Sequence, residues 1–539
     1  MAELPKDKRT ETFDAVVVGA GFAGLYMLHK LRELGLTCGV FEAGEGVGGA
    51  WYWNRYPGAR CDSESYFYCY SFSDELLQEW TWSERFPGQP EIERYLNFVA
   101  DRLDLRRDIR FNARVVAAHY NEDSRRWTIR TEAGDTAEAR YLVTAIGGLT
   151  TANVPTIPGL GDFRGDWYHT GRWPREGVDL SGKRVGVIGT GSTGTQAIPV
   201  IARQAADLTV FQRTPAYIMP ARNHPLDPGF VSAVKADYAA IWRKAKSSRG
   251  GMPYDPPTLD LDEVDEGEAR RLYEEAWERG GVRVLQVFKD VYSNMKSNDF
   301  AANFFRDKVR QIVKDPATAE TLAPKGYPVG AKRVALDTHY YETFNLPHVH
   351  VVDVKKNPIT KITPTGICAG GVDYPLDVIV FATGYDAVTG SFRAMDIRGR
   401  DGLRLADRLA EGPRAYLGLA FAGFPNLLTV NGPCNPALST NVPVSIEHDV
   451  EWIADCIAFL ERNGIKAIEP SEEAEEAWGQ DTQAKVAGSI FEQADSWQFG
   501  SNVPGKPRRF LLWLGGHAAF REKCAEVADA GYAGFRLTR

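Results

Sequence analysis

Two groups of glycines give the first indication of chemistry in this 539-residue sequence. Each group has the form Gly-x-Gly-x-x-Gly and follows a short apolar run. In such a group the first glycine permits a tight turn, the second lets the backbone approach a pyrophosphate, and the third lets a helix pack closely against a strand. The six residues are Gly19, Gly21 and Gly24, and then Gly189, Gly191 and Gly194. The sequence therefore predicts two dinucleotide sites.

The residues after each second strand predict which dinucleotide each site holds. Glu42 ends the first unit, where a carboxylate accepts hydrogen bonds from an unmodified ribose, as in FAD. Arg213 and Thr214 stand at the corresponding place in the second unit, and arginine pairs with the 2′-phosphate of NADPH. An alternative is that Arg213 is a solvated surface charge and the site accepts either NADPH or NADH. Three residues after the second turn are also expected to face NADPH: Ser192, Thr193 and Gln196.

The elements that must position these residues predict an α/β fold with two Rossmann-like dinucleotide-binding domains. A short apolar run at 15–18, leucines at helical spacing before Gly35 and a second run ending at Phe41 predict a strand–helix–strand unit. The same pattern returns after Lys183. Neither unit can bury its sheet alone, so the C-terminal part must complete one of the two folds.

The domain boundaries follow from these patterns. Charged segments with helical periodicity and few strands fill the middle of the chain, which we interpret as a helical insertion. We expect a FAD-binding domain from 1–150 and 385–539, an NADPH-binding domain from 151–224 and 334–384, and the insertion at 225–333.

Composition and charge exclude several classes of function. The net charge of −8 is spread along the chain, which argues against a nucleic-acid or anionic-membrane surface. No apolar run approaches the roughly 18 to 20 residues of a membrane span, and the polar N-terminus does not resemble a signal peptide. The seven cysteines include no C-x-x-C pair, which disfavours a disulfide reductase. We expect a cytoplasmic, monomeric protein without a metal site.

Two further motifs carry a resemblance to a known family. The first joins Phe163, Gly165, His169, Trp173 and Pro174 in one linker between the two glycine groups. The second has the form GGxWxxxxYPGxxxD and runs over 48–62. The sequence resembles the Baeyer–Villiger monooxygenases, flavoenzymes that insert oxygen beside a ketone carbonyl, over nearly its whole length. The cyclohexanone, cyclopentadecanone and steroid enzymes are the members it resembles most.

The resemblance implies FAD and NADPH as cofactors, and a ketone and O₂ as substrates. NADPH would reduce FAD, and a C4a-peroxyflavin would convert the ketone to an ester or lactone. By the same resemblance, Arg333 would stabilise the anionic peroxide and Asp62 would orient Arg333. Arginine suits this role because it stays charged and can serve two acceptors at once. The remaining implied cofactor contacts are Gly49, Trp51, Tyr56 and Asp62 for FAD, and Lys332, Arg333 and Trp497 for NADP.

Other interpretations of these residues remain open. His169 and Trp173 could set the orientation of the domains rather than take part in chemistry, and we favour that structural role. Without the two motifs, Arg333 and Asp62 would be read as a plain interdomain salt bridge. An S- or N-oxygenating flavoenzyme, or a flavin-dependent NADPH dehydrogenase without oxygenation, are the alternative functions. The sequence does not identify the ketone.

Overall fold

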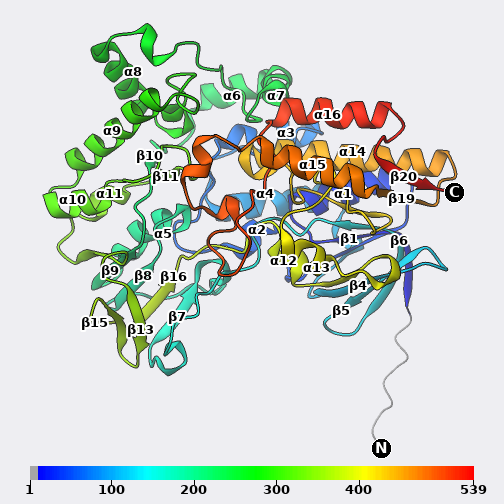
Figure 1. Cartoon of the computed structure of the whole chain (residues 1–539), viewed down its shortest axis with the longest axis horizontal. Helices are drawn as coiled ribbons and strands as arrows, with labels where there is room; N and C mark the ends of the chain where they lie inside the picture. Colours follow the sequence, from blue (N-terminus) through cyan, green and yellow to red (C-terminus); the bar gives the residue numbers. More distant parts are fainter. Residues whose placement is uncertain (1–9) are drawn as a thin grey trace, which may run out of the picture.

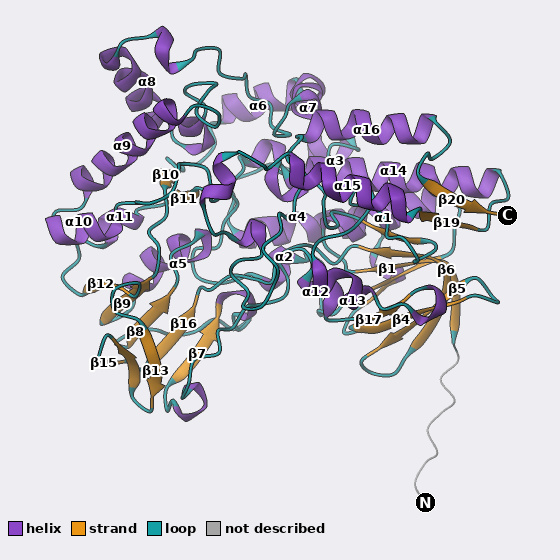
Figure 2. Ribbon diagram, in the orientation of Figure 1, coloured by secondary structure: helices purple, strands orange, loops and turns teal. Residues whose placement is uncertain are grey.

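The computed structural model describes residues 10–539 and is built on two separate sheets that are each largely parallel (Figure 1). In the ribbon of Figure 2 the first sheet lies on the right and the second on the lower left, with helices packed above and between them. The α/β fold class with two Rossmann-like units is therefore confirmed.

The first sheet contains the first glycine group and takes strands from both ends of the chain. Its order is β17-β4-β5-β6-β1-β2-β3, and β18 pairs with β6. The pairs of β1 with β2 and with β6 are parallel, whereas β4, β5 and β6 form an antiparallel meander. The strands are β1 (Glu11–Val18), β2 (Cys38–Phe41), β3 (Ile109–Arg110), β4 (Val115–Asn121), β5 (Arg126–Thr131), β6 (Thr136–Thr144), β17 (Asp396–Arg398) and β18 (Leu427–Thr429).

Helix α1 (Phe22–Glu33) begins directly after Gly21 and is buried along most of its first two turns. A Cβ atom on Gly24 would lie 1.8 Å from the carbonyl oxygen of Gly19, so only glycine allows the helix to approach the turn. On its other side α1 packs against α14 (Val442–Arg462). The C-terminal part of the chain thus completes the first fold.

The second sheet contains the second glycine group and is entirely parallel, with the order β12-β9-β8-β16-β7. Helix α5 (Ser192–Ala202) connects β8 to β9. The strands are β7 (Asp166–His169), β8 (Arg184–Ile188), β9 (Asp207–Gln212), β12 (Val349–Asp353) and β16 (Val378–Phe381). A small antiparallel sheet joins β12 to β16 and consists of β13 (Ile359–Thr363), β14 (Gly366–Ala369) and β15 (Val372–Pro375).

The helical insertion leaves and re-enters the second domain through a parallel pair, β10 (Ile218–Pro220) and β11 (Ala335–Asp337). Its helices are α6 (Pro228–Ala236), α7 (Tyr238–Ser247), α8 (Glu266–Arg279), α9 (Met295–Ile312) and α10 (Pro316–Leu322). The insertion packs in three parts. Buried side chains of α6 and α7 join the hydrophobic core of the first domain, and α8 and most of α9 pack into a separate core. The end of α9 and α10 join the core of the second domain.

The remaining helices cover the first domain or connect the parts, except α11, which packs against α5 in the second domain. They are α2 (Ala50–Trp53), α3 (Asp74–Glu79), α4 (Gln89–Arg102), α11 (Tyr340–Thr343), α12 (Gly390–Arg393), α13 (Leu405–Arg408), α15 (Glu472–Ala484) and α16 (His517–Asp529). The chain ends in a strand pair, β19 (Ala467–Pro470) with β20 (Phe535–Thr538). All seven cysteines are free thiols. Among residues 10–539, no helix has the length and apolarity needed to cross a membrane.

Candidate active site between the two glycine turns

A cavity of about 730 Å³ lies between the two domains and is lined by both glycine turns. Gly21 and Gly49 meet on the first side, where a Cβ atom on Gly49 would lie 2.8 Å from the Cα atom of Gly21. Gly191 lines the second side, and a Cβ atom there would meet no protein atom within 4 Å. The open space over Gly191 fits the backbone approach that a pyrophosphate requires, whereas the first turn is packed closely against Gly49.

The two helices behind these turns have free N-terminal amides. Gly21 is the N-cap of α1 and Gly191 the N-cap of α5, and neither helix has a side-chain cap or an acidic residue in its first turn. Uncapped N–H groups and the positive end of the helix dipole bind phosphate groups. Ser192 and Thr193, at the start of α5, also line the cavity. The chain therefore fits two dinucleotides.

Glu42 follows β2 and is 4% exposed. Its two carboxylate oxygens accept hydrogen bonds from the backbone N–H groups of Ala20 and Gly44, each at 2.7 Å. Burial raises the pKa of Glu42, and these two hydrogen bonds oppose the shift. Glu42 thus braces the first glycine turn, and each oxygen retains capacity for a ribose hydroxyl. Glu42 does not lie among the residues that line the cavity.

The loop that carries the second motif faces the cavity and contacts α5. Trp51 donates from its indole N–H to the hydroxyl of Tyr68 at 3.1 Å. The hydroxyl of Tyr56 donates to Oε1 of Gln196 at 2.8 Å, and Nε2 of Gln196 donates to the carbonyl of Arg60 at 3.0 Å. Gln196 therefore links the second domain to the 48–62 loop, in addition to its expected contact with NADPH.

The cations expected for a 2′-phosphate lie together at one end of the cavity. Arg213 follows β9, and Arg213, Thr214 and Lys332 all line the cavity wall. The ammonium group of Lys332 lies 4.9 Å from the ring centroid of Tyr327. Burial and the neighbouring charge of Arg213 lower the pKa of Lys332. The negative charge of an anionic ligand would offset both effects and favour the charged lysine, as expected at a phosphate subsite.

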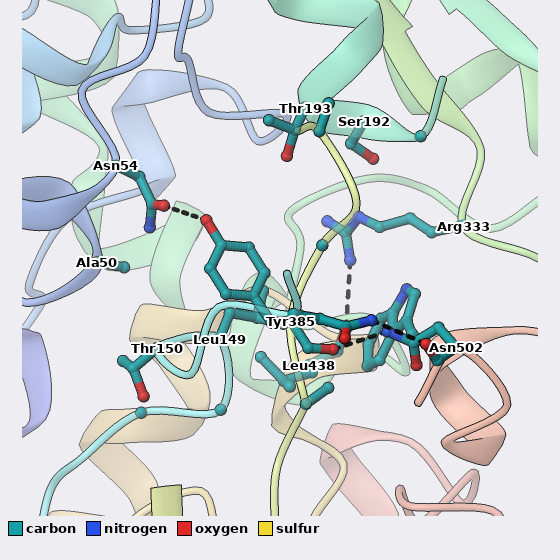
Figure 3. Close-up of a pocket in the computed structure, with 18 of the residues that line it drawn as sticks. Ala50, Asn54, Leu149, Thr150, Ser192, Thr193, Arg333, Tyr385, Leu438 and Asn502 are labelled. Atoms are coloured by element: carbon teal, nitrogen blue, oxygen red, sulfur yellow. Dashed lines mark hydrogen bonds between the residues drawn. The ribbon is translucent and has the colours of Figure 1, made fainter. Parts of the chain in front are cut away.

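Arg333 and Asp62 lie together although they are far apart in the sequence. Nε and Nη2 of Arg333 both donate to Oδ2 of Asp62, at 2.9 and 2.6 Å. Nη1 donates to the carbonyl of Leu438 at 3.2 Å, as Figure 3 shows. The charge of Asp62 raises the pKa of Arg333. The side chain remains 41% exposed and lines the cavity, so a fixed cation faces the enclosed space.

The residues of the first motif hold the linker against β16 rather than facing the cavity. His169 ends β7, is 2% exposed and accepts a hydrogen bond at Nδ1 from the N–H of Gly171 at 3.0 Å. Burial lowers the pKa of His169 to about 4, so the ring is neutral at pH 7. Trp173 is buried against Tyr168, and Phe163 packs at the edge of the second sheet.

The other two residues of the motif belong to the linker backbone. A Cβ atom on Gly165 would lie 2.3 Å from the carbonyl oxygen of Asp377. Pro174 follows the buried Trp173 and completes the motif. This placement supports an orienting role.

Sequence comparison identifies the family. A model of the flavin-binding monooxygenase-like proteins matches residues 14–232. A Baeyer–Villiger monooxygenase from Pseudooceanicola batsensis is 45% identical over 96% of this chain and 95% of its own. The chain belongs to the flavin-binding monooxygenases of the Baeyer–Villiger type. A phenazine N-monooxygenase from Lysobacter antibioticus is 44% identical over 97% of both chains, so relatives at this distance include an enzyme named for oxidation at nitrogen.

Solved structures of the family superpose closely on this Baeyer–Villiger-type chain. A closed crystal structure of cyclohexanone monooxygenase has a TM-score of 0.96 at 47% identity and covers 98% of this chain and 100% of that one. An oxidised steroid monooxygenase bound to NADP has a TM-score of 0.92 at 49% identity, with the same coverage. FAD and NADPH are the cofactors of this monooxygenase.

Several residues of this monooxygenase site could not be found from sequence motifs. Trp497 begins a short 3₁₀ turn and lines the cavity as expected, but Asn502 from the same loop also lines it. Leu438 supplies the carbonyl that binds Arg333, and Tyr385 and Asn54 form a hydrogen-bonded pair in the wall (Figure 3). Of these residues, Asn54 alone lies inside a recognised motif, at one of the positions that the 48–62 motif leaves unspecified. Among residues 10–539, no group of three His, Cys, Asp or Glu is placed to hold a metal ion.

Proposed function

We propose that this monooxygenase converts a ketone to an ester or lactone, with Arg333 and Asp62 as its catalytic pair. The observation that carries the proposal is the guanidinium of Arg333, which is held by Asp62 and Leu438 while its remaining surface faces the cavity between the two glycine turns. The ketone-oxidising relatives support the substrate class. Sequence and geometry together thus favour oxygen insertion beside a carbonyl.

The chain's own residues supply binding, orientation and charge. FAD, reduced by NADPH, supplies the oxygen-transferring group when both cofactors are bound. Arg333 places a permanent positive charge where negative charge develops on oxygen, and it requires no reorganisation because Asp62 and Leu438 already fix its plane. Lysine could not hold both partners with one rigid fork. Asp62 therefore acts by orienting Arg333.

The assignment of cofactors to domains rests on the two turns. The first turn and its brace Glu42 would hold the adenosine half of FAD, with Gly49, Trp51 and Tyr56 from the adjacent loop. The second turn would hold NADPH, with Arg213, Thr214 and Lys332 on the 2′-phosphate. These remain proposals, as do the domain boundaries, the monomeric state and the cytoplasmic location. The free thiols support the last of these.

The test is a panel of cyclic, linear, aromatic and steroid ketones given to the purified, FAD-loaded chain with NADPH and O₂. We expect oxidation of NADPH to rise with a subset of ketones and most of the NADPH consumed to be matched by ester or lactone. A sulfide and a heteroaromatic amine belong in the same panel, because of the relative that acts on phenazine. Oxygenation of the amine or sulfide with no ester from any ketone would refute the proposal. Steady reduction of an artificial acceptor without any oxygenated product would identify a dehydrogenase.

A further inference from the structure

Tyr385 lies where four segments of the chain meet at the wall of the cavity. It lies in the segment after β16, where the chain crosses back from the second domain to the first. Its side chain is 9% exposed, and its hydroxyl donates a hydrogen bond to Oδ1 of Asn54, in the loop that also carries Gly49 and Trp51 (Figure 3). Burial raises the pKa of the Tyr385 phenol well above its usual value, so the hydroxyl keeps its proton.

The ring of Tyr385 contacts the linker that carries the other motif. The ring lies edge-on to His169, with centroids 6.0 Å apart and planes at 81°. A Cβ atom on Gly171 would lie 2.7 Å from the Tyr385 ring, so the linker backbone packs directly on it. His169 holds the N–H of Gly171 and thereby fixes the surface against which the tyrosine rests. The two sequence motifs thus touch different parts of one side chain.

The backbone of Tyr385 binds the loop that contains Trp497. Nδ2 of Asn502 donates to the carbonyl of Tyr385 at 2.7 Å, and Nδ2 of Asn153 donates to the carbonyl of Asn502 at 2.8 Å. A few residues on, Nζ of Lys506 donates to Oδ1 of Asp386 at 2.5 Å, and the lysine side chain is only 6% exposed. Two residues of the loop, Asn502 and Lys506, therefore bind the segment after β16 at Tyr385 and Asp386.

We infer that Tyr385 is a positioning residue that couples closure of the 494–506 loop to the placement of the 48–62 loop around Asn54. Asn502 binds the backbone carbonyl of Tyr385 and so holds the 494–506 loop closed. The hydroxyl of Tyr385 binds Asn54 and so holds the 48–62 loop in the matching position. The side-chain oxygen of Asn502 and the hydroxyl of Ser501 are buried without a protein partner in residues 10–539, and both residues line the cavity. These acceptors can bind polar groups of a ligand, so occupancy of the cavity would tighten the same contact.

The coupling has a direct consequence for oxygen transfer, and this part rests on the proposed function. A site that opens before the ketone has reacted consumes NADPH and O₂ and releases hydrogen peroxide instead of ester. Tyr385 and Asn502 would therefore control the fraction of NADPH that ends in product, with less influence on the rate at which NADPH is first oxidised.

The experiment compares Tyr385→Phe, Asn54→Ala and the double variant with Tyr416→Phe, in the full FAD-loaded chain. Tyr416 is a matched control, because its exposure is also 9% and its hydroxyl donates to one carbonyl, that of Ala533, in the C-terminal region. We expect hydrogen peroxide released per NADPH to rise about three- to tenfold in both single variants, the range expected for one lost hydrogen bond. The double variant should be no worse than either single one, and Tyr416→Phe should match the wild type.

A second measurement tests the latch without any turnover. Trypsin can cleave after Arg508 and Arg509, which are exposed next to the loop. Asn502→Ala should be cleaved there at least threefold faster than the wild type, with and without NADP⁺. Tyr385→Phe keeps the backbone carbonyl but loses the contact with Asn54, so its cleavage rate should lie between the two. Equal cleavage of Asn502→Ala and wild type, or additive effects of Tyr385→Phe and Asn54→Ala, would overturn the inference. If no ketone is oxygenated by the wild type, the proposed function fails, and the protease result still decides on the latch.

Discussion

Replacement of Arg333 tests the core of the mechanism. In Arg333→Ala the cavity loses its fixed cation, and the Asp62 carboxylate, 25% exposed, loses the two hydrogen bonds that neutralise it. The native fold should survive, because the Arg333 side chain is 41% exposed and lies at the cavity wall rather than in a core. The change therefore acts on the reacting oxygen and not on the packing of the domains.

The size of the effect follows from what the guanidinium supplies. Loss of one preorganised donor at a developing oxyanion costs on the order of 10²- to 10³-fold in kcat, or about 3 to 4 kcal/mol. Arg333→Lys keeps the charge, but an ammonium group has no planar fork to reach Asp62 and Leu438 together. Two charge-assisted hydrogen bonds are then weakened, and we expect a loss of about ten- to a hundredfold.

The assay measures ester formation and NADPH oxidation side by side, with Asp62→Asn as a third variant. In Arg333→Ala the ester should fall about 10²-fold or more while flavin content and the unfolding temperature stay close to those of the wild type. Asp62→Asn retains an acceptor for Arg333 and should lie between the wild type and Arg333→Lys. If Arg333→Ala forms ester at more than a third of the wild-type rate, the cation is not part of the chemistry and the pair is only a salt bridge.

Four further substitutions test the nucleotide sites and the linker. Arg213→Ala should raise KM for NADPH about ten- to a hundredfold, because a charge-assisted contact with the 2′-phosphate is lost, and should leave KM for NADH within twofold. Steady-state kinetics with both coenzymes measures this difference. Equal effects on both coenzymes would refute the 2′-phosphate contact. Gly191→Ala should keep the unfolding temperature but weaken NADP⁺ binding in calorimetry, because its Cβ enters open space, whereas Gly194→Ala should destabilise the fold, because its Cβ would lie 2.2 Å from a backbone oxygen. His169 has a folded pKa of about 4, below its unfolded value, so its contribution is complete above pH 6.5 and is lost as the pH falls towards 4. Between pH 7 and 5 the free energy of unfolding should therefore fall about 2 kcal/mol more in the wild type than in His169→Gln, measured by denaturant titration, and parallel curves would contradict the neutral, buried state of the ring.

The sequence alone was sufficient for features that depend on neighbours along the chain. The glycine turns, the helix that begins after Gly21 and the strand that ends at Phe41 are confirmed, because each depends on local sterics and periodicity. The first strand begins at Glu11, before the apolar run at 15–18, since pairing with β6 extends it. Local patterns also could not show that the insertion divides among three hydrophobic cores.

Contacts between distant residues required either a resemblance or the structure. Arg333 and Asp62 are 271 positions apart, and no rule of spacing brings them together. The resemblance supplied that pair, but not Leu438, whose contribution is a backbone carbonyl that any residue could offer. Tyr385 and Asn54 are 331 positions apart; Asn54 lies at an unspecified position of the 48–62 motif, and Tyr385 belongs to neither motif. Contacts made by backbone acceptors, such as the Leu438 carbonyl, and by variable motif positions, such as Asn54, leave no pattern in the sequence.

The orientation of Arg333 depends on contacts from three separate segments of the chain. The arginine enters from the end of the helical insertion, just before β11, while Asp62 and Leu438 belong to two separate stretches of the flavin-side chain. All three segments must be docked before the guanidinium plane is fixed. A chain whose domains have drifted apart would still bind each nucleotide on its own turn, yet it would lack an aligned cation. Oxygen transfer therefore requires that the domains are docked, in addition to binding of both nucleotides.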